Sequence, residues 1–449
     1  MKIPFWTKNT DDKKENNTQG DKSKNAFFER VTGFFSAEPQ KEKILRYEDF
    51  QNATDPYYAT VSARYKVTQR VLALLLVLFL LFSIFTNIRE ITYGNLFYFV
   101  RDFGNAVDIA SIDYETLSYD VYPNQNFSMY RGGVAAISPS NISAFTATGR
   151  RTLKSRADFV MPYAVCSDKY VLVYDMSGDS FALYNSFSKV HTEELNAPIT
   201  DAYISDSGVF AVVTGSAGYK SVINVYNKNF KLIGKYSKDL YAIDVCIDDS
   251  GERMAALFYD IGDGRGKTVL RIYDISNRTS KNNGKDPDED RILYEHTFLY
   301  QFPLACSFLE GGKLSVLTDN TSAIFESNKV EYELYDSYEY GGEISAVYAG
   351  ESGSAIAIKN STLNDVNKVV AFDSEGKLLY EDTVRESVRE VAVFGEYVFI
   401  KSDTGVVRVH TKNGEEEKYT TQAGHMLVYD ASTVIVCGES KAIYVKFKD

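Results

Sequence analysis

The sequence predicts an all-β protein, a β-propeller of eight four-stranded blades, preceded by one transmembrane helix and a mostly disordered N-terminal leader. Three observations support this prediction: a strand pattern that repeats about every forty residues, one long apolar run near the N-terminus, and a composition rich in aromatics. The 449 residues include 33 Tyr and 28 Phe against nine Pro and one Trp. Aromatic residues are enriched in strands, so the composition favours strands over helices.

The leader, residues 1–69, is predicted to be polar and cytoplasmic. Residues 7–25 are almost entirely charged, amide, hydroxyl or glycine residues, and such a segment has too little apolar surface to fold. Residues 26–35 are more apolar, and Phe27, Val31 and Phe34 fall on one helical face at spacings of three and four. We interpret this face as the contact for a cytoplasmic partner. The inner leaflet of the membrane could also cover this face, and a transient helix without a dedicated partner is the other alternative.

Residues 70–88 are predicted to form an uncleaved membrane anchor. Between Arg70 and Arg89 lie 18 residues, whose only polar members are one Ser, one Thr and one Asn. Eighteen residues is about the minimum length of a helix that spans a membrane. Their fourteen Leu, Val, Ile and Phe residues favour insertion by roughly 4 to 8 kcal/mol. A polar leader of this length disfavours a cleaved signal peptide. The predicted anchor residues are Val71, Leu75, Leu78, Phe82 and Phe85.

The charge distribution predicts the orientation and excludes one class of partner. Residues 1–70 carry 13 Lys and Arg against 10 Asp and Glu, which is +3, and the remainder carries 36 against 51, which is −15. The positive-inside rule then places the leader in the cytoplasm and the propeller outside the cell membrane. Residues 89–104, rich in aromatics, are expected to form an interfacial stalk, and packing of these aromatics in a core with the next domain is the alternative. An acidic main body argues against nucleic-acid binding.

The repeat beyond residue 104 predicts the propeller, which we assign to residues 105–449. First strands centred on residues 201, 244, 305, 346, 391 and 428 are separated by 43, 61, 41, 45 and 37 residues. The one long spacing contains a polar run at residues 276–291, which we interpret as a loop inserted within one unit. Four strands and about 40 to 45 residues per unit are typical of a propeller blade.

The end of the chain predicts how the ring closes. The last unit, from Gly424, shows only three strands before the chain stops. Propellers avoid an exposed strand edge by completing the last blade with a strand from the start of the domain, and residues 106–112 are the candidate strand. Early units over 117–158 and 159–198 bring the count to eight blades. Seven blades is the alternative if the first unit is irregular.

Two hairpins, at residues 142–153 and 369–379, resemble the outer strands of PQQ-like and WD40-like blades. The whole plan of polar leader, one span and acidic propeller resembles an uncharacterised family of membrane-anchored propeller proteins of low-GC Gram-positive bacteria. The resemblance covers about residues 105–449 and implies a propeller outside the membrane, with no activity to transfer. The Trp motif of PQQ repeats is missing, because Trp6 in the leader is the only Trp.

No catalytic residue, cofactor site or metal site is predicted. Residues 264–268 resemble a phosphate-binding loop, but Ile261 stands where the motif needs glycine. Asp260 with Asp263, or the acidic run at 286–290, is better interpreted as solvated loop than as a Ca²⁺ site. The four histidines lack metal spacing and are taken as surface or strand residues: His191, His296, His410 and His425. The four cysteines lack a Cys-x-x-Cys spacing and are taken as small apolar residues: Cys166, Cys246, Cys306 and Cys437.

These features predict a non-enzymatic interaction scaffold or adaptor in a cell-envelope complex. Its propeller loops would bind an envelope protein or glycan, and its leader a cytoplasmic protein. The membrane is a single-pass partner, nucleic acid is excluded, and no small-molecule substrate is identified. The alternative is an extracytoplasmic hydrolase or lyase that acts on a cell-wall glycan with carboxylates around the propeller channel, because fold alone does not decide function.

Overall fold

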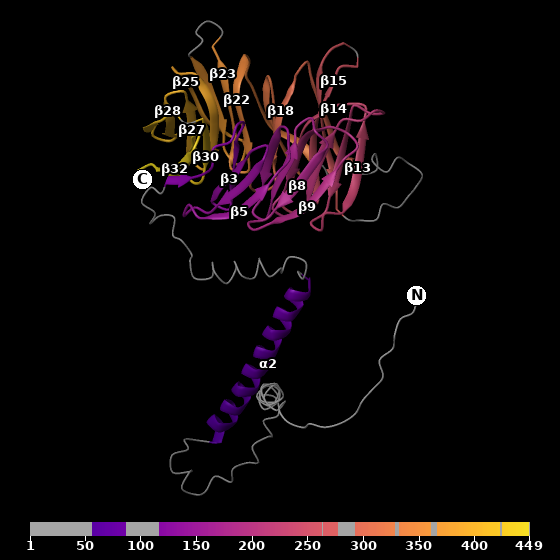
Figure 1. The fold of residues 1–449 in the computed structure, drawn as a ribbon, viewed down its shortest axis with the longest axis vertical. Coiled ribbons are helices and arrows are strands. Elements are labelled where there is room, and N and C mark those ends of the chain that lie inside the picture. Colours follow the sequence, from indigo (N-terminus) through magenta and orange to yellow (C-terminus); the bar gives the residue numbers. More distant parts are fainter. Residues whose placement is uncertain are drawn as a thin grey trace, which may run out of the picture. The chain divides into compact units, whose positions relative to one another are not determined.

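The computed structural model describes residues 56–86, 116–262, 264–276, 292–327, 332–360, 366–422 and 424–448. The chain divides into two compact units, Met1–Tyr93 and Gly94–Asp449. The first contains the described helix α2, and the second contains every described strand (Figure 1).

Helix α2 spans Pro56–Thr86 and begins at a proline, whose fixed backbone angle suits the first turn of a helix. Its large apolar side chains from Val71 to Phe82 are 45% to 69% exposed. None of the described helices meets the length and hydropathy required to cross a membrane, so the structure does not support the span predicted at 70–88. Residues 87 and 88 lie outside the described part of the chain.

The C-terminal unit contains eight four-stranded antiparallel sheets, which confirms the predicted all-β propeller with eight blades and rules out seven. The first blade consists of β2 (Asn126–Tyr130), β3 (Gly133–Ile137), β4 (Asn141–Phe145) and β5 (Arg151–Arg156). The second consists of β6 (Pro162–Cys166), β7 (Val171–Asp175), β8 (Ser180–Tyr184) and β9 (Lys189–Glu194). The third consists of β10 (Ile199–Ile204), β11 (Phe210–Thr214), β12 (Ser221–Tyr226) and β13 (Leu232–Lys238).

The remaining blades follow the same plan. The fourth consists of β14 (Tyr241–Ile247), β15 (Arg253–Asp260), β16 (Lys267–Asp274) and β17 (Ile292–Leu299). The fifth consists of β18 (Pro303–Phe308), β19 (Leu314–Thr318), β20 (Thr321–Ser327) and β21 (Tyr332–Glu339). The sixth consists of β22 (Glu343–Gly350), β23 (Gly353–Lys359), β24 (Asn367–Phe372) and β25 (Leu378–Val384). The seventh consists of β26 (Val388–Phe394), β27 (Tyr397–Ser402), β28 (Gly405–His410) and β29 (Glu416–Thr420).

The eighth blade is built from both ends of the domain. It consists of β30 (His425–Val428), β31 (Thr433–Cys437), β32 (Lys441–Lys446) and β1 (Thr116–Ser118), in that order. Strand β1 is antiparallel to β32, with Leu117 opposite Ala442, and Figure 1 shows the first and last strands of the ring side by side. The predicted closure by an N-terminal strand is therefore confirmed.

The predicted position of that strand is wrong. The strand that pairs with β32 is 116–118, whereas the predicted residues 106–112 lie outside the described part of the chain. Leu117, assigned from the sequence to the start of the first blade, belongs to the last one. The physical reason is length: a three-residue strand with one buried side chain shows almost no alternation in the sequence.

The core lies between neighbouring blades. Every residue of a second strand such as β11 is buried, whereas an outer strand such as β29 alternates between exposed and half-buried residues. One cluster joins Leu270 of the fourth blade to Phe325 of the fifth, both fully buried. Inner strands contact the inner strands of adjacent blades, so the first strand of each blade faces the central axis. Each blade is therefore buried on both faces, as apolar strand runs require.

Candidate interaction surfaces

The strand order gives the propeller two distinct faces. Turns between first and second strands, and between third and fourth strands, emerge on one face, which we call the turn face. Connections between blades, and turns between second and third strands, emerge on the opposite face, which we call the entry face. Both definitions follow from the antiparallel order of each sheet.

An exposed apolar patch occupies the entry face around the fourth blade, and we call it the aromatic patch. Its members are large apolar side chains between 40% and 65% exposed: Tyr219, Tyr241, Ile261, Leu299, Tyr300 and Phe302. Tyr241 lies opposite Tyr259 across β14 and β15, and the Tyr259 ring packs edge-on against Phe302 at 4.9 Å. Exposed apolar side chains gathered on one face mark an interaction site more often than a scatter of single residues does.

Two cations lie on the aromatic patch. The Lys220 ammonium lies 5.3 Å from the centre of the Tyr241 ring. The Arg265 guanidinium lies 5.7 Å from the Tyr300 ring and donates a hydrogen bond of 2.8 Å to its hydroxyl. Neither cation forms an ion pair with a carboxylate of the described residues. The patch therefore offers apolar surface together with positive charge.

The nearby Asp260 offsets part of that charge, because the Lys220 ammonium is among the groups that lower its pKa. Its carboxylate forms an ion pair of 3.2 Å with Lys267 and accepts the Gly262 N–H at 2.9 Å. The Gly262 N–H and then Lys267 lower the pKa of Asp260. Asp260 is part of one of the two acidic segments that the sequence offers as candidate Ca²⁺ loops. In the structure both of its carboxylate oxygens already have partners, Lys267 and the Gly262 N–H.

The turn face carries acidic residues instead. In five consecutive blades, from the second to the sixth, the turn between the first and second strands contains at least one acidic residue, and we call this set the acidic arc: Asp168, Asp206, Asp249, Glu310 and Glu351. Adjacent turns are linked, because the Asp168 N–H donates to Asp206 Oδ1 at 2.8 Å and the Glu310 N–H donates to the Glu351 carbonyl at 2.9 Å. No group of three or more potential metal ligands is close enough to hold an ion in the described parts of the chain.

This acidic arc makes stability depend on pH. Burial, and then the repulsion of Asp249 and Asp206, raise the pKa of Glu351 from 4.5 to about 7. A carboxyl whose pKa is raised on folding holds its proton longer in the folded state, so its contribution is lost as pH rises from about 4.5 to about 7. Glu351→Gln should therefore raise the free energy of unfolding at pH 8 and change it little at pH 4. The gain at pH 8 should be only about 1 kcal/mol, because the side chain is partly exposed and solvent screens its charge.

Urea unfolding at pH 4 and pH 8 measures this difference. The control is Glu375→Gln, because Lys377 lowers the pKa of Glu375, so that variant should gain nothing at pH 8. Equal stability of Glu351→Gln and the unmodified protein at pH 8 would show that the carboxylates of the arc do not repel one another.

The carboxylates near the central channel link blades. Five inner strands shift register near their start, and in three of them the residue after the shift is acidic: Asp201, Asp244 and Glu390. Asp244 Oδ2 accepts the Cys306 N–H at 2.6 Å, and Glu390 Oε2 accepts the Met426 N–H at 2.7 Å, each from the next blade. Burial raises the pKa of both Asp201 and Asp244, that of Asp244 to about 6. The contacts of Asp244 and Glu390 thus hold inner strands of neighbouring blades together, whereas Asp201 Oδ2 is buried without a hydrogen-bond partner among the described residues.

The four histidines lie in four different blades, and the four cysteines all lie within strands. His191, His296 and His410 lie on outer or third strands, and His425 begins β30, where its Nδ1 lies 3.1 Å from Glu390 Oε1. That contact raises the pKa of His425. The cysteines are free thiols, three of them buried and Cys166 half-buried.

The membrane and partner residues predicted from the sequence have different outcomes. Val71, Leu75, Leu78 and Phe82 lie on α2 with exposed side chains, and Phe85 lies within the helix at a position whose side chain is not described. The leader face of Phe27, Val31 and Phe34 lies outside the described residues. Both assignments stay predictions.

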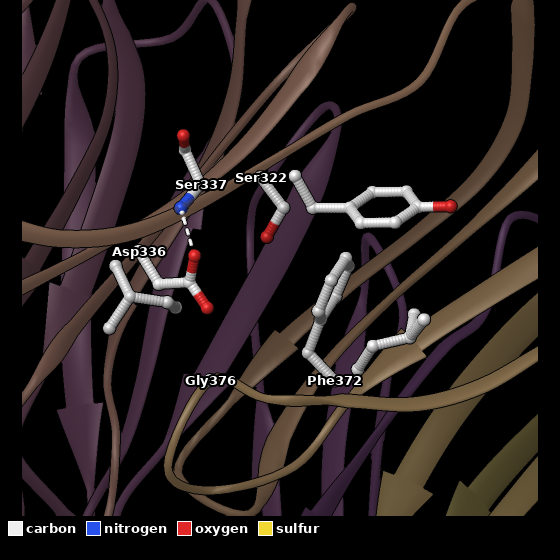
Figure 2. Close-up of a pocket in the computed structure, with 8 residues that line it drawn as sticks. Ser322, Asp336, Ser337, Phe372 and Gly376 are labelled. Carbon is white, nitrogen blue, oxygen red and sulfur yellow. Dashed lines mark hydrogen bonds between the residues drawn. The ribbon is translucent and has the colours of Figure 1, made fainter.

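A small cavity of about 70 Å³ lies between the fifth and sixth blades (Figure 2). The Ser322 hydroxyl and the Asp336 carboxylate lie on its polar side, where Asp336 Oδ1 accepts the Ser337 N–H at 2.8 Å. Phe372 lines the apolar side, with Tyr338 at 5.6 Å in an edge-on contact. The volume corresponds to about two water molecules, which is too small for an organic ligand.

Sequence reasoning missed the aromatic patch. Tyr300 and Phe302 stand in the connection between two predicted blades, and large aromatics outside strands were the available signal. Arg265 belongs to the segment rejected as a phosphate loop, and the structure gives it a different position, over Tyr300.

These observations define the protein as an eight-bladed β-propeller with an aromatic patch on one face and an acidic arc on the other. The chain belongs to a family of unknown function, DUF5711, whose model matches residues 112–446. This agrees with the expected likeness to an uncharacterised propeller family.

Solved propellers are similar in fold at low identity. The WD40 domain of SCAP from fission yeast is 10% identical with a TM-score of 0.49, covering 75% of this chain and 98% of that one. BamB from Moraxella catarrhalis is 13% identical with a TM-score of 0.47, covering 74% and 98%. The Pan2 WD40 domain of Neurospora crassa is 8% identical with a TM-score of 0.45, covering 75% and 98%. No curated protein matches the chain.

Proposed function

We propose that this protein is a membrane-anchored, non-enzymatic interaction scaffold of the cell envelope, and that its aromatic patch binds another protein. The observation that carries the proposal is the position of these exposed aromatic side chains on one face of a rigid ring, where Tyr241 pairs with Tyr259 across two strands and the Tyr259 ring packs against Phe302. Exposed aromatic side chains with few rotatable bonds lose little entropy on binding and dominate interface energies.

The charge of the patch specifies the kind of partner. Lys220 and Arg265 lie over aromatic rings and face no ion-pair partner among the described residues. A segment with apolar side chains next to Asp or Glu would cover the rings and pair with both cations. The partner is therefore an acidic, apolar protein segment.

The proposed anchor is the apolar segment predicted from the sequence at residues 70–88, most of which lies in α2. Its apolar side chains are exposed on all sides between Val71 and Phe82, and a helix that is apolar all round needs an apolar environment. The charge bias then places the N-terminus in the cytoplasm and the propeller outside the cell membrane. Tethering raises the effective concentration of the propeller for partners at the same surface, so even weak contacts suffice.

Site-specific crosslinking in native membranes tests the scaffold proposal. A photoreactive amino acid at position 300 should capture one protein through a peptide that contains Asp or Glu beside apolar residues. The same group at Leu334, which is exposed on the outer strand β21, is the matched control and should not capture that protein. Tyr300→Ser with Phe302→Ser should reduce the crosslinked yield by about ten-fold or more.

Two results would contradict the proposal. If positions 300 and 334 capture the same proteins in equal yield, the patch is not a docking site. If the chain leaves the membrane fraction in an alkaline wash, the anchor is not α2, and the crosslinking result then stands for the propeller alone.

A further inference from the structure

A second cavity, of about 510 Å³, opens on the turn face between the fourth and fifth blades. It lies at the opposite end of the strands from the aromatic patch, near the end of β14 and the start of β15, whose blade stands beside β18 in Figure 1. Its volume falls in the range of small-molecule sites. Charged side chains of both signs line it.

Arg253 is the fixed cation of this cavity. Its Nε donates to Asp248 Oδ2 at 2.9 Å, and its Nη1 donates to the Tyr332 hydroxyl at 2.6 Å. Asp248 is itself nearly fully buried and also accepts the N–H groups of Glu252 and Arg253 at 2.9 and 3.0 Å. The guanidinium therefore has one orientation before any ligand arrives, which is the condition for a bidentate contact.

The remaining edge of Arg253 faces the cavity wall. Its Nη2 has no hydrogen-bond partner among the described residues, and a Cβ added to Gly312 would lie 3.6 Å from it. Gly312 and its neighbour Gly311 both have positive φ, 84° and 87°, so the backbone conformation of this wall favours glycine at both positions. A planar anion is the group that such an edge binds best.

Carboxylates line the same cavity. Asp274 lies opposite Arg253 in the ladder of β15 and β16, and its Oδ1 accepts the Ser276 N–H at 2.9 Å. Glu326, near the end of β20 in the fifth blade, and Glu252 are the other two. Leu293 and the buried Tyr332 supply apolar surface.

We propose that this cavity binds a free α-amino acid as its zwitterion. The ligand carboxylate pairs with the Nη2 edge of Arg253, and the ligand ammonium pairs with Glu326 and Asp274. The lining holds three carboxylates against Arg253 and Lys313, so a polyanion would still meet more negative than positive side chains, and a cation without a carboxylate would leave the guanidinium edge unused. A neutral saccharide could form hydrogen bonds but would satisfy neither charge. The side chain of the amino acid contacts Leu293, which favours an aliphatic one.

Calorimetric titration of the full-length protein tests each charge of the ligand separately. Leucine is the probe, leucinamide lacks the carboxylate, N-acetyl-leucine lacks the ammonium, and maltose represents a saccharide. Leucine should bind, and each of the two blocked forms should bind about ten-fold or more weakly, because each loses a charge-assisted hydrogen bond. Maltose should not bind.

Variants locate the site. Glu326→Gln should weaken leucine binding by about ten-fold, whereas Glu333→Gln, its exposed cross-strand neighbour outside the cavity, should not change it. Arg253→Lys keeps the positive charge next to Asp248 but removes the planar guanidinium. This variant should weaken the binding of leucine and leave the binding of leucinamide unchanged.

The proposal is overturned by any of three results. The first is the absence of any heat of binding with leucine at millimolar concentration. The second is equal affinity for leucine and N-acetyl-leucine, and the third is binding of maltose that Glu326→Gln reduces. The proposal does not rest on the scaffold function, because the cavity and the aromatic patch lie on opposite faces and are tested with different variants.

Discussion

Leu117→Asp should open the ring. Leu117 is 1% exposed and packs with Ala442 and Tyr444 of the last blade and Phe145 of the first. It is the only buried side chain of the three-residue strand that closes the propeller. A charge at this position removes the apolar contacts and buries an unpaired carboxylate, so we expect a loss of about 4 kcal/mol in the free energy of unfolding.

Urea unfolding together with limited proteolysis measures the effect. The variant should lose β30–β32 to protease first, because β32 becomes an exposed edge. Thr116→Asp places the same charge in the same strand at an exposed position and serves as the control. If Leu117→Asp and Thr116→Asp unfold at the same urea concentration, β1 does not hold the ring together.

The blades could be predicted because their signal is repetitive. Second strands such as β11 and β19 are buried at every residue, so the same apolar run returns once per blade. The irregular spacing was also interpreted correctly, since β16 and β17, on either side of residues 277–291, pair in one sheet. Periodicity and burial are local properties of a strand, and the sequence records them directly.

Closure and surface could not be predicted in the same way. Strand β1 is recognisable as a strand only through its pairing with β32, more than 300 residues away. The aromatic patch depends on which side chains remain uncovered, and the sequence alone does not show that Tyr241, the first residue of a strand, is exposed. The role of the channel carboxylates cannot be recognised in the sequence, because they accept hydrogen bonds from backbone N–H groups of another blade.

The two faces differ in what they can bind. The entry face combines exposed rings with Lys220 and Arg265, whereas the turn face carries the acidic arc and the cavity at Arg253. An acidic protein segment is repelled by the arc and attracted by the patch. The charge distribution therefore directs that partner to the entry face. A small zwitterion, which carries no net charge, can reach the cavity beside the arc.

The last prediction concerns Arg408, which joins the seventh blade to the eighth. Its guanidinium is 5% exposed and lies between the rings of Tyr397 and Phe447, at 4.6 and 5.2 Å from their centres. It donates to the Ala431 carbonyl and to Glu417 Oε1, each at 3.0 Å. Arg408→Ala removes the stacking, leaves a buried carbonyl without its donor and leaves Glu417 without its cation. The expected loss is about 3 to 5 kcal/mol.

Arg408→Met separates packing from charge. Methionine fills the space between the two rings without burying a charge, so it should cost clearly less than alanine, because a buried ion pair is often replaced by apolar packing at little cost. Urea midpoints of the two variants give the comparison. Equal losses for Met and Ala would assign the stability of this junction to the hydrogen bonds and the ion pair, and a loss below about 1 kcal/mol for both would show that the guanidinium does not hold the last two blades together.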